Sequence, residues 1–546
     1  MHSSLALHHG HIRTLDPRHP VAEALLIRGE TLTAVGSDEE IRSLDRNAES
    51  IDLQGRTVLP GFNDSHLHTL GYGRFLGVTD LRGCASVEEM LLRLRPALGD
   101  PEDPDSWLTG RGWDQERFHA LPQGPSRPFF DRSCLDGLPT RRPLLLERNC
   151  GHVGVANTRG LQVLGLFRED PFGPTQVDRD EKGEPTGVLR EDALEWARGQ
   201  VYRIDFDSAL RFFARAGEAF ARRGITSVQS DDLGPLGTDL DMLLRLFGAL
   251  REKDLFPVRL NEQFLLPRRE DLEAFLEGGY RTGQGDGHFR FGPLKMLLDG
   301  SLGARTAALR RDYADDPGNR GLLLYGPEAL KERVARAHGA GMQVAIHCIG
   351  DRSLQTALEA YEAALAETPR DARHTIVHCQ VGDGELYDRM ARLGVAAAVQ
   401  PPFVASDQSI APPRLGADRL AGAYPVKGLL DRGILTTGGS DAPVEDPAPL
   451  RGLWAAVTRQ REPGNPAEGW LPGERISFPE ALDLYTRAGA RLSFEEHVKG
   501  ALIPGFYGDL TVLREDPFRV DPEALPDLPV DLTVCGGRIT WRSPDL

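Results

Sequence analysis

PGFNDSHLH, residues 60–68, follows the apolar segment 57–59 and ends in two histidines that are separated by one residue. Successive side chains of an extended strand point to opposite faces, so His66 and His68 lie on the same face. Two imidazoles on one face can bind a divalent metal ion together. Because a His-x-His pair in a strand is commonly incidental, this interpretation depends on further ligands elsewhere in the chain.

Seven more apolar segments follow, with amphipathic helix patterns such as 328–338 and 354–367 between some of them. The segments are 224–230, 258–266, 291–298, 343–348, 374–379, 395–400 and 434–439. With the strand that ends at His66 and His68 they make eight. Eight strands alternating with helices predict an α/β fold, a (β/α)8 TIM-like barrel, with its functional site at the C-terminal ends of the strands.

Polar side chains that can bind metal stand at or near the ends of several of these strands. They are His66, His68, Lys295, His347, His378 and Asp441. Taken singly, a histidine between apolar residues is often a hydrogen-bonded core residue, a lysine can extend to the surface, and an aspartate after Gly-Gly-Ser commonly forms a turn. Because strand ends meet at one mouth of a barrel, the set as a whole favours a centre with two metal ions.

Lys295 needs a separate argument, because an ammonium group cannot bind a cation. Burial lowers the pKa of a lysine, so that the neutral amine can form. That amine can add carbon dioxide and give a carbamate, whose two oxygens can bridge metals about 3.5–4 Å apart. The alternative is a lysine that pairs with Asp299.

Both ends of the chain are rich in strand patterns, and Gly536-Gly537 predicts a hairpin between 530–535 and 538–541. We therefore expect a composite β-sandwich domain from residues 1–58 and 500–546, beside a barrel domain of 59–499. Residues 69–205 are far too many for a βα loop and predict an inserted subdomain over the barrel mouth.

The chain has 546 residues and a net charge of −17, which argues against nucleic acid or an anionic membrane as a partner. Its six cysteines include no Cys-x-x-Cys pair, which favours a reducing compartment. Neither a signal peptide nor an apolar stretch approaching the ~20 residues of a membrane helix is visible. We expect a cytoplasmic protein with a small-molecule substrate, and the sequence leaves a homo-oligomer open.

Longer motifs resemble the amidohydrolase superfamily, in particular its YtcJ-like branch (amidohydrolase family 3), over nearly the whole chain. The motifs are residues 60–68, 112–114, 151–152, 295–307, 347–352, 373–380 and 440–443. The resemblance implies metal ligation by four histidines, a carboxylated Lys295 as the bridge, and Asp441 as ligand and proton shuttle. The four histidines are His66, His68, His347 and His378. It also implies the composite β-sandwich.

Four further residues are candidates for substrate contact. His152 is expected to contact the substrate or the developing oxyanion, and Trp113 to form an apolar wall or to pack within the insertion. Asp299 and Arg305 follow the Lys295 strand and are expected to contact substrate, to order the loop, or to form a local salt bridge.

The predicted function is a metal-dependent hydrolase that cleaves a C–N bond of amide, N-acyl or N-formyl type, other than a peptide bond. Metal-activated hydroxide attacks the carbonyl carbon, and Asp441 takes the proton of the water and passes it to the leaving nitrogen. Zinc is the favoured metal, although imidazole and carboxylate ligands also suit iron, manganese, cobalt or nickel. The alternatives are an esterase, lactonase or deaminase on the same barrel, or a non-catalytic binding scaffold.

Overall fold

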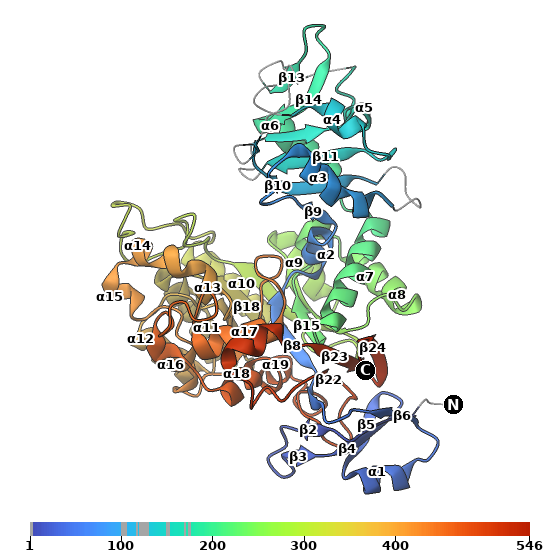
Figure 1. The fold of residues 1–546 in the computed structure, drawn as a ribbon. Helices are drawn as coiled ribbons and strands as arrows, with labels where there is room; N and C mark the ends of the chain where they lie inside the picture. The colour runs from blue at the N-terminus through green and yellow to red at the C-terminus, as the bar shows by residue number, and fades with distance from the viewer. Residues whose placement is uncertain are drawn as a thin grey trace. The chain divides into compact units, whose positions relative to one another are not determined.

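The computed structural model describes residues 4–99, 106–115, 118–119, 130–148, 153–168, 171–172 and 176–546. The chain forms two compact units, of which one combines Met1–Tyr72 with Ala209–Leu546 and the other is Gly73–Ser208. Figure 1 shows the helices and strands of both. Among the described helices, none has the length and apolar character needed to span a bilayer.

Eight parallel strands form the barrel of the larger unit, and each one pairs with the next in chain order. They are β8 (Phe62–Leu67), β15 (Ile225–Ser230), β16 (Arg259–Leu265), β17 (Phe289–Leu297), β18 (Val344–Cys348), β19 (Thr375–His378), β20 (Ala396–Val399) and β21 (Thr436–Gly438). Most of their residues are buried on both faces, as expected for parallel strands between a barrel interior and a layer of helices. The prediction of a (β/α)8 barrel is confirmed.

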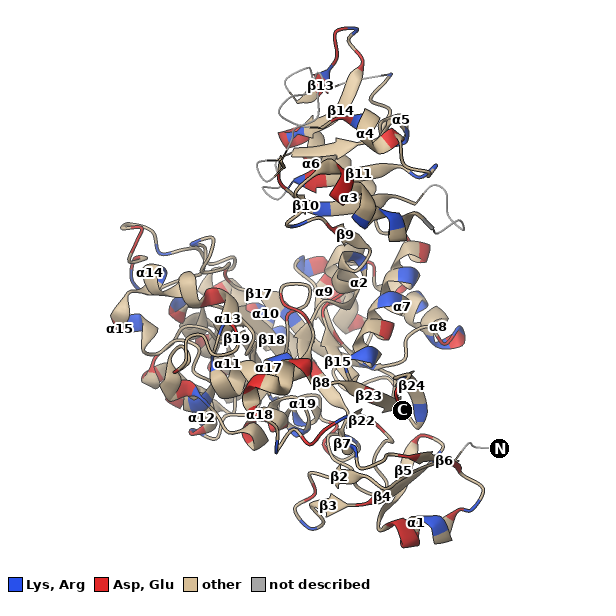
Figure 2. Ribbon diagram, viewed as in Figure 1, with Lys and Arg blue, Asp and Glu red and all other residues tan. Residues whose placement is uncertain are grey.

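Helices separate the strands along the chain because their apolar residues recur with helical spacing. In α7 (Phe206–Arg222), for example, Leu210, Phe213, Gly217 and Phe220 are buried on one face. The other helices between strands include α8 (Leu240–Glu252), α9 (Arg269–Glu277), α10 (Pro327–Gly339), α11 (Asp351–Glu367), α12 (Gly384–Leu393), α13 (Phe403–Ser406), α14 (Ala411–Leu415), α15 (Ala417–Leu420) and α16 (Val426–Leu430). After β21 come α17 (Pro449–Thr458), α18 (Phe478–Leu484) and α19 (Arg487–Leu492). Acidic and basic residues are interspersed along these helices (Figure 2).

Hydrogen bonds between the first strand and the segment after the last one complete the barrel. The Asp441 N–H donates to the His66 carbonyl at 2.8 Å, and the His68 N–H donates to the Ala442 carbonyl at 2.9 Å. Gly439 permits this approach, because a Cβ there would lie 2.8 Å from the His66 nitrogen. The metal-ligand candidates of both segments are thereby held at the same place.

Strands from both ends of the chain build the β-sandwich. One sheet has the order β5-β4-β1-β6 and the other the order β24-β23-β22-β7-β2-β3. Their bounds are β1 (Ser4–His8), β2 (His11–Arg13), β3 (Val21–Ala22), β4 (Ala24–Arg28), β5 (Thr31–Gly36), β6 (Glu49–Asp52), β7 (Thr57–Pro60), β22 (Leu510–Leu513), β23 (Val530–Cys535) and β24 (Arg538–Arg542), with α1 (Asp38–Leu44) alongside β4 and β5. The composite domain is thus confirmed as part of the fold.

The PGFNDSHLH stretch runs from the sandwich directly into the barrel. Residues 57–60 are β7, which pairs with β2 and β22 in the sandwich, and residues 62–67 are β8 of the barrel. Between them, Gly61 packs so closely against Thr226 that a Cβ would overlap the threonine side chain. The glycine is required because the first barrel strand touches its neighbour at this point.

The smaller unit contains a mixed sheet of order β13-β14-β12-β11-β10-β9. Its elements are β9 (Val78–Asp80), β10 (Leu108–Trp113), β11 (Leu144–Arg148), β12 (Val153–Ala156), β13 (Val177–Arg179), β14 (Pro185–Arg190), α3 (Val87–Leu94), α4 (Arg132–Asp136), α5 (Thr158–Val163) and α6 (Glu191–Val201). The helix α2 (Thr69–Phe75) leads into it from the barrel. This large insertion after the first barrel strand has an apolar core of its own, around Leu144, Leu146 and Trp113.

Candidate metal centre

The ends of five barrel strands bring the predicted ligands together at the C-terminal end of the barrel. The residues are His66 on β8, His68 just after it, Lys295 on β17, His347 on β18, His378 as the last residue of β19, and Asp441 after β21. Ring centroids lie 5.6 Å apart for His66 and His378, and 4.5 Å apart for His347 and His378. The rings therefore form a continuous row from His66 on β8 through His378 on β19 to His347 on β18.

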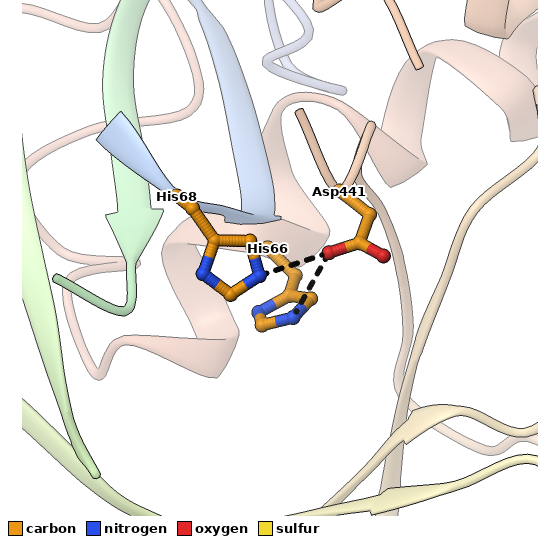
Figure 3. Close-up of side chains that lie close together, drawn as sticks. All are labelled: His66, His68 and Asp441. Atoms are coloured by element: carbon orange, nitrogen blue, oxygen red, sulfur yellow. Dashed lines mark ion pairs between the residues drawn. The ribbon is translucent and has the colours of Figure 1, made fainter. Parts of the chain in front are cut away.

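His66, His68 and Asp441 form the tightest group. Oδ1 of Asp441 lies 3.2 Å from Nε2 of His68 and 3.5 Å from Nε2 of His66. One nitrogen or oxygen from each of the three residues lies within 4.8 Å of the others. Figure 3 shows both imidazoles turned toward the carboxylate. Ligand atoms at this spacing fit one ion with bonds of about 2.0–2.2 Å.

Lys295 connects this group to the barrel interior. Its side chain is 1% exposed, and Nζ lies 3.0 Å from Nε2 of His66. Burial lowers the pKa of Lys295, against the opposing effect of the nearby Asp231 and Asp441 carboxylates. The alternative of a pair with Asp299 does not describe the structure, because the contact of Nζ is with His66.

Burial also decides the charge of the histidines. It lowers the pKa of His66 well below the usual value, an effect that the neighbouring Lys295 strengthens, and it lowers the pKa of His378 to about 3. For His68, burial is outweighed by the hydrogen bond to Asp441 and by the Asp231 and Asp441 charges, which raise its pKa to about 9. Two of the imidazoles are thus neutral at pH 7 and offer lone pairs, which is the form that binds metal.

Asp64 holds the two ends of the barrel sheet in register at the site. Its buried carboxylate accepts hydrogen bonds from the N–H of Ser440, at 3.1 Å to each oxygen, and from the N–H of His66 at 3.2 Å. Asp441, which follows Ser440, has a left-handed backbone with φ 58°, and His378 has one with φ 75°. Such conformations are uncommon for residues other than glycine and cluster at functional sites.

Two hydrogen bonds determine which nitrogen of the histidines faces the site. Nδ1 of His68 lies 3.0 Å from the carbonyl of Asp231, and Nδ1 of His378 lies 2.6 Å from Oε1 of Gln400. Gln400 donates its own Nε2 to the Ala398 carbonyl at 3.1 Å, which fixes the amide with its oxygen toward the imidazole. His378, which is neutral, therefore carries its proton on Nδ1 and presents Nε2 as the lone pair. In His68, Nδ1 donates to the Asp231 carbonyl, and Nε2 would become a ligand on loss of the proton that it shares with Asp441.

Asp64 and Gln400 were not among the residues predicted from the sequence. Asp64 lies in the decisive stretch, two residues before His66, and Gln400 ends the predicted seventh strand. The position of Gln400 at a strand end was the available signal, but an amide does not suggest metal ligation by itself.

The predicted substrate-contact residues have other partners in the structure. Asp299 accepts the N–H groups of Ala308, Ile349 and Gly350 at 2.9–3.0 Å and the Ser353 hydroxyl at 2.6 Å. Its Oδ1 also lies 3.5 Å from Nε2 of His347, which contacts the Gly300 carbonyl at 3.1 Å. Asp299 thus orders the loop after β17.

Arg305 forms an ion pair with Asp315 at 3.0 Å, and Trp113 is fully buried against Phe130 in the core of the smaller unit. His152 lies outside the described residues. Substrate contact by His152, Asp299, Arg305 and Trp113 stays a prediction.

The residues present fit a metal ion. Nδ1 of His66 is buried without a hydrogen-bond partner among the described residues, while its Nε2 faces Asp441 and Lys295. The Nε2 side, which faces the carboxylate and the lysine, is therefore the side on which an ion would bind, and Nδ1 would be left for a water to satisfy. Imidazole and carboxylate donors suit zinc and its transition-metal neighbours. His66, His68 and Asp441 could hold one ion, with Lys295, His347 and His378 beside them for a second.

Comparison with known proteins agrees with this geometry. Residues 49–541 match the amidohydrolase family. The chain is 33% identical to "Putative amidohydrolase YtcJ" of Bacillus subtilis, over 98% of this chain and 99% of that protein. It is 25% identical to the N-substituted formamide deformylase of Arthrobacter pascens, over 98% of each. An uncharacterized metal-dependent hydrolase from Pyrococcus horikoshii OT3 matches with a TM-score of 0.74 at 28% identity, over 95% of this chain and 99% of that structure.

Proposed function

The chain belongs to the amidohydrolase family, and from that premise we propose that it hydrolyses a C–N bond of amide, N-acyl or N-formyl type in a small-molecule substrate. The observation that carries the proposal is the convergence of His66, His68 and Asp441 beside a buried lysine at the C-terminal end of the barrel. The name of the Arthrobacter pascens relative, a formamide deformylase, supports the choice of bond.

We propose two divalent ions, with zinc as the metal. His66, His68 and Asp441 would hold the first, and His347 and His378 the second. Lys295 would bridge them after its neutral amine adds carbon dioxide and releases a proton, which leaves a carbamate with two oxygens. The burial that lowers its pKa, against the opposing charges of Asp231 and Asp441, favours that reaction. The amine already lies 3.0 Å from the His66 ring.

When bound, such ions supply Lewis acidity toward the substrate carbonyl and lower the pKa of water. Asp441 is the residue that would move the proton, because its carboxylate reaches into the group from the last strand. It accepts a proton from the attacking water and delivers it to the leaving nitrogen, so that an acid and an amine are the products. His68, whose Nε2 lies 3.2 Å from Asp441 Oδ1, would share the first ion with that carboxylate.

The test is release of amine from a panel of N-formyl and N-acyl amines by zinc-loaded enzyme, with matching esters and lactones beside them. Hydrolysis of amides in preference to esters supports the proposal. Turnover of esters or lactones alone, or release of ammonia from an amino-substituted ring, would contradict the proposed bond.

A further inference from the structure

Three large apolar side chains are exposed beside the β17 end of the site. Leu297 is 37% exposed, Leu322 43% and Leu324 55%. Residues 322–324 alternate between exposed, half-buried and exposed, so Leu322 and Leu324 share the open side. We call these three residues the leucine shelf. Contiguous exposed apolar groups commonly mark a binding surface.

Strand periodicity places Leu297 at the barrel mouth. Lys295 and Leu297 are two residues apart on β17 and therefore point to the same face, which for Lys295 is the face toward His66. Leu297 is also the strand partner of His347. It is the last residue of β17 and its one exposed position. Leu297 thus continues the line of site residues toward solvent.

Backbone hydrogen bonds bring the other two leucines to the same strand end. The Leu324 N–H donates to the Leu298 carbonyl at 2.8 Å, and the Leu322 N–H donates to the Thr306 carbonyl at 3.2 Å. The segment therefore runs along the end of β17. Because both of its exposed side chains are apolar, the shelf offers contact area rather than hydrogen bonds.

Four charged residues of the same loop pair with one another. Arg305 pairs with Asp315 at 3.0 Å, and Arg320 pairs with Asp312 at 2.6 Å. Arg414 also binds Asp315. These charges are engaged in ion pairs, so they offer little attraction to a charged substituent.

We propose that the leucine shelf binds an uncharged apolar substituent, alkyl or aryl, of the substrate whose C–N bond is cleaved; this rests on the proposed function. Leu297 lies on the Lys295 face of β17, and residues 322–324 are hydrogen-bonded beside the end of that strand. A group attached to a carbonyl held at the metal centre would extend toward the shelf. Burial of one methylene raises kcat/KM by at most about fourfold, and partial burial by about twofold.

The experiment compares two substrate series on zinc-loaded enzyme. One series is N-alkylformamides from methyl to hexyl, and the other is N-methyl amides from acetyl to octanoyl. We expect kcat/KM to rise by about twofold per methylene in the series whose substituent faces the shelf, which identifies the acyl or the amine side. A double variant, Leu322→Ser with Leu324→Ser, should lose about tenfold more for the longest member than for the shortest.

Leu44→Ser is the matched control, because Leu44 is 49% exposed at the end of α1 in the sandwich. Its slope against chain length should equal that of the wild type. Turnover without chain-length dependence in either series, or an unchanged slope in the double variant, would overturn the shelf while leaving the amide hydrolase intact.

Failure to turn over any amide would contradict the proposed function instead. The shelf is then judged by the thermal shift that the same compounds give. A shift that grows with chain length in the wild type and not in the double variant supports it, and a shift independent of length overturns it.

Discussion

The strand β19 has a buried histidine at each end, and the two differ only in what surrounds them. His374 directly precedes the strand at the N-terminal end of the barrel, and His378 closes it at the C-terminal end. Both are at most 5% exposed, and burial lowers the pKa of each to about 3. By burial and pKa, the two cannot be told apart.

Their hydrogen bonds distinguish them. Nδ1 of His374 accepts the Val344 N–H at 3.0 Å, so its Nε2 donates to Nδ1 of His338 at 2.9 Å. His338 in turn donates Nε2 to the Thr368 carbonyl at 2.8 Å, and this pair has no unused ring nitrogen. His378 has one neutral partner, Gln400, and the described residues supply no hydrogen bond to its Nε2. The lone pair of an imidazole at a strand end, near a carboxylate and without a hydrogen-bond donor, therefore distinguishes the proposed ligand His378 from the core residue His374, whereas burial does not.

We expect the largest effect from replacing Asp441, the proposed proton shuttle. Asp441→Asn should lower kcat by about 10²–10⁴-fold, because general acid–base transfer contributes that much. A change at the N-terminal end of the barrel, His374→Gln, should alter kcat by less than about threefold. Amine release at saturating substrate measures both. Full turnover of Asp441→Asn with metal still bound would show that another group moves the proton.

Metal removal should lower the Tm by an amount that depends on residues at the C-terminal end of the barrel and not on those at the N-terminal end. An ion present at about 1,000 times its dissociation constant stabilises the folded protein by about 4 kcal/mol. Chelation should therefore lower the Tm of the wild type and of His374→Gln equally, and that of His378→Ala by less, because that variant loses a ligand of the second ion only. Scanning calorimetry with and without chelator gives the comparison. An equal shift in all three proteins would mean that His378 does not contribute to metal binding.

Removal of the side chain that hydrogen-bonds the histidine should weaken metal binding for His378 and not for His374. Gln400→Ala frees the His378 ring and should weaken metal binding by about 10–100-fold. Gln400→Glu keeps an acceptor at Nδ1 and should restore binding. His338→Ala, which removes the partner of His374, is the control and should leave the affinity unchanged. Competition with a chromophoric chelator measures it, and equal affinities of Gln400→Ala and wild type would contradict the orienting role.

The smallest effect is the pH dependence of stability that His374 causes. In the unfolded protein His374 has a pKa of about 6.5, and in the folded protein its pKa is about 3. Between these values the unfolded state holds more protons, so the free energy of unfolding falls as the pH is lowered, by about 2 kcal/mol at pH 5. His374→Gln should remove that part of the slope in metal-free protein. Denaturant titrations at pH 7 and pH 5 give the free energy of unfolding of the variant and of wild type. The same difference between the two pH values in both proteins would show that His374 does not stay neutral.

Sequence patterns predicted the eight barrel strands because each is a short, mostly apolar run and several of the segments between them have helical periodicity. They also predicted the hairpin, since Gly536 and Gly537 separate β23 from β24. The contacts of Asp64 and Gln400 depend on which strands become neighbours in three dimensions, and a local pattern does not contain that information. The partners of Asp299 are backbone N–H groups of distant residues, which carry no signature in side-chain identity. Trp113 is as compatible with a core as with a pocket wall.

The central claim is that the C-terminal end of the barrel holds a metal centre bridged through Lys295, and metal content per chain tests it most directly. Wild type and Lys295→Ala would be purified with bicarbonate and zinc, and the bound metal counted by mass spectrometry. The account predicts about two ions in the wild type and loss of at least one in the variant. An equal metal content in both proteins, or none in either, would contradict it.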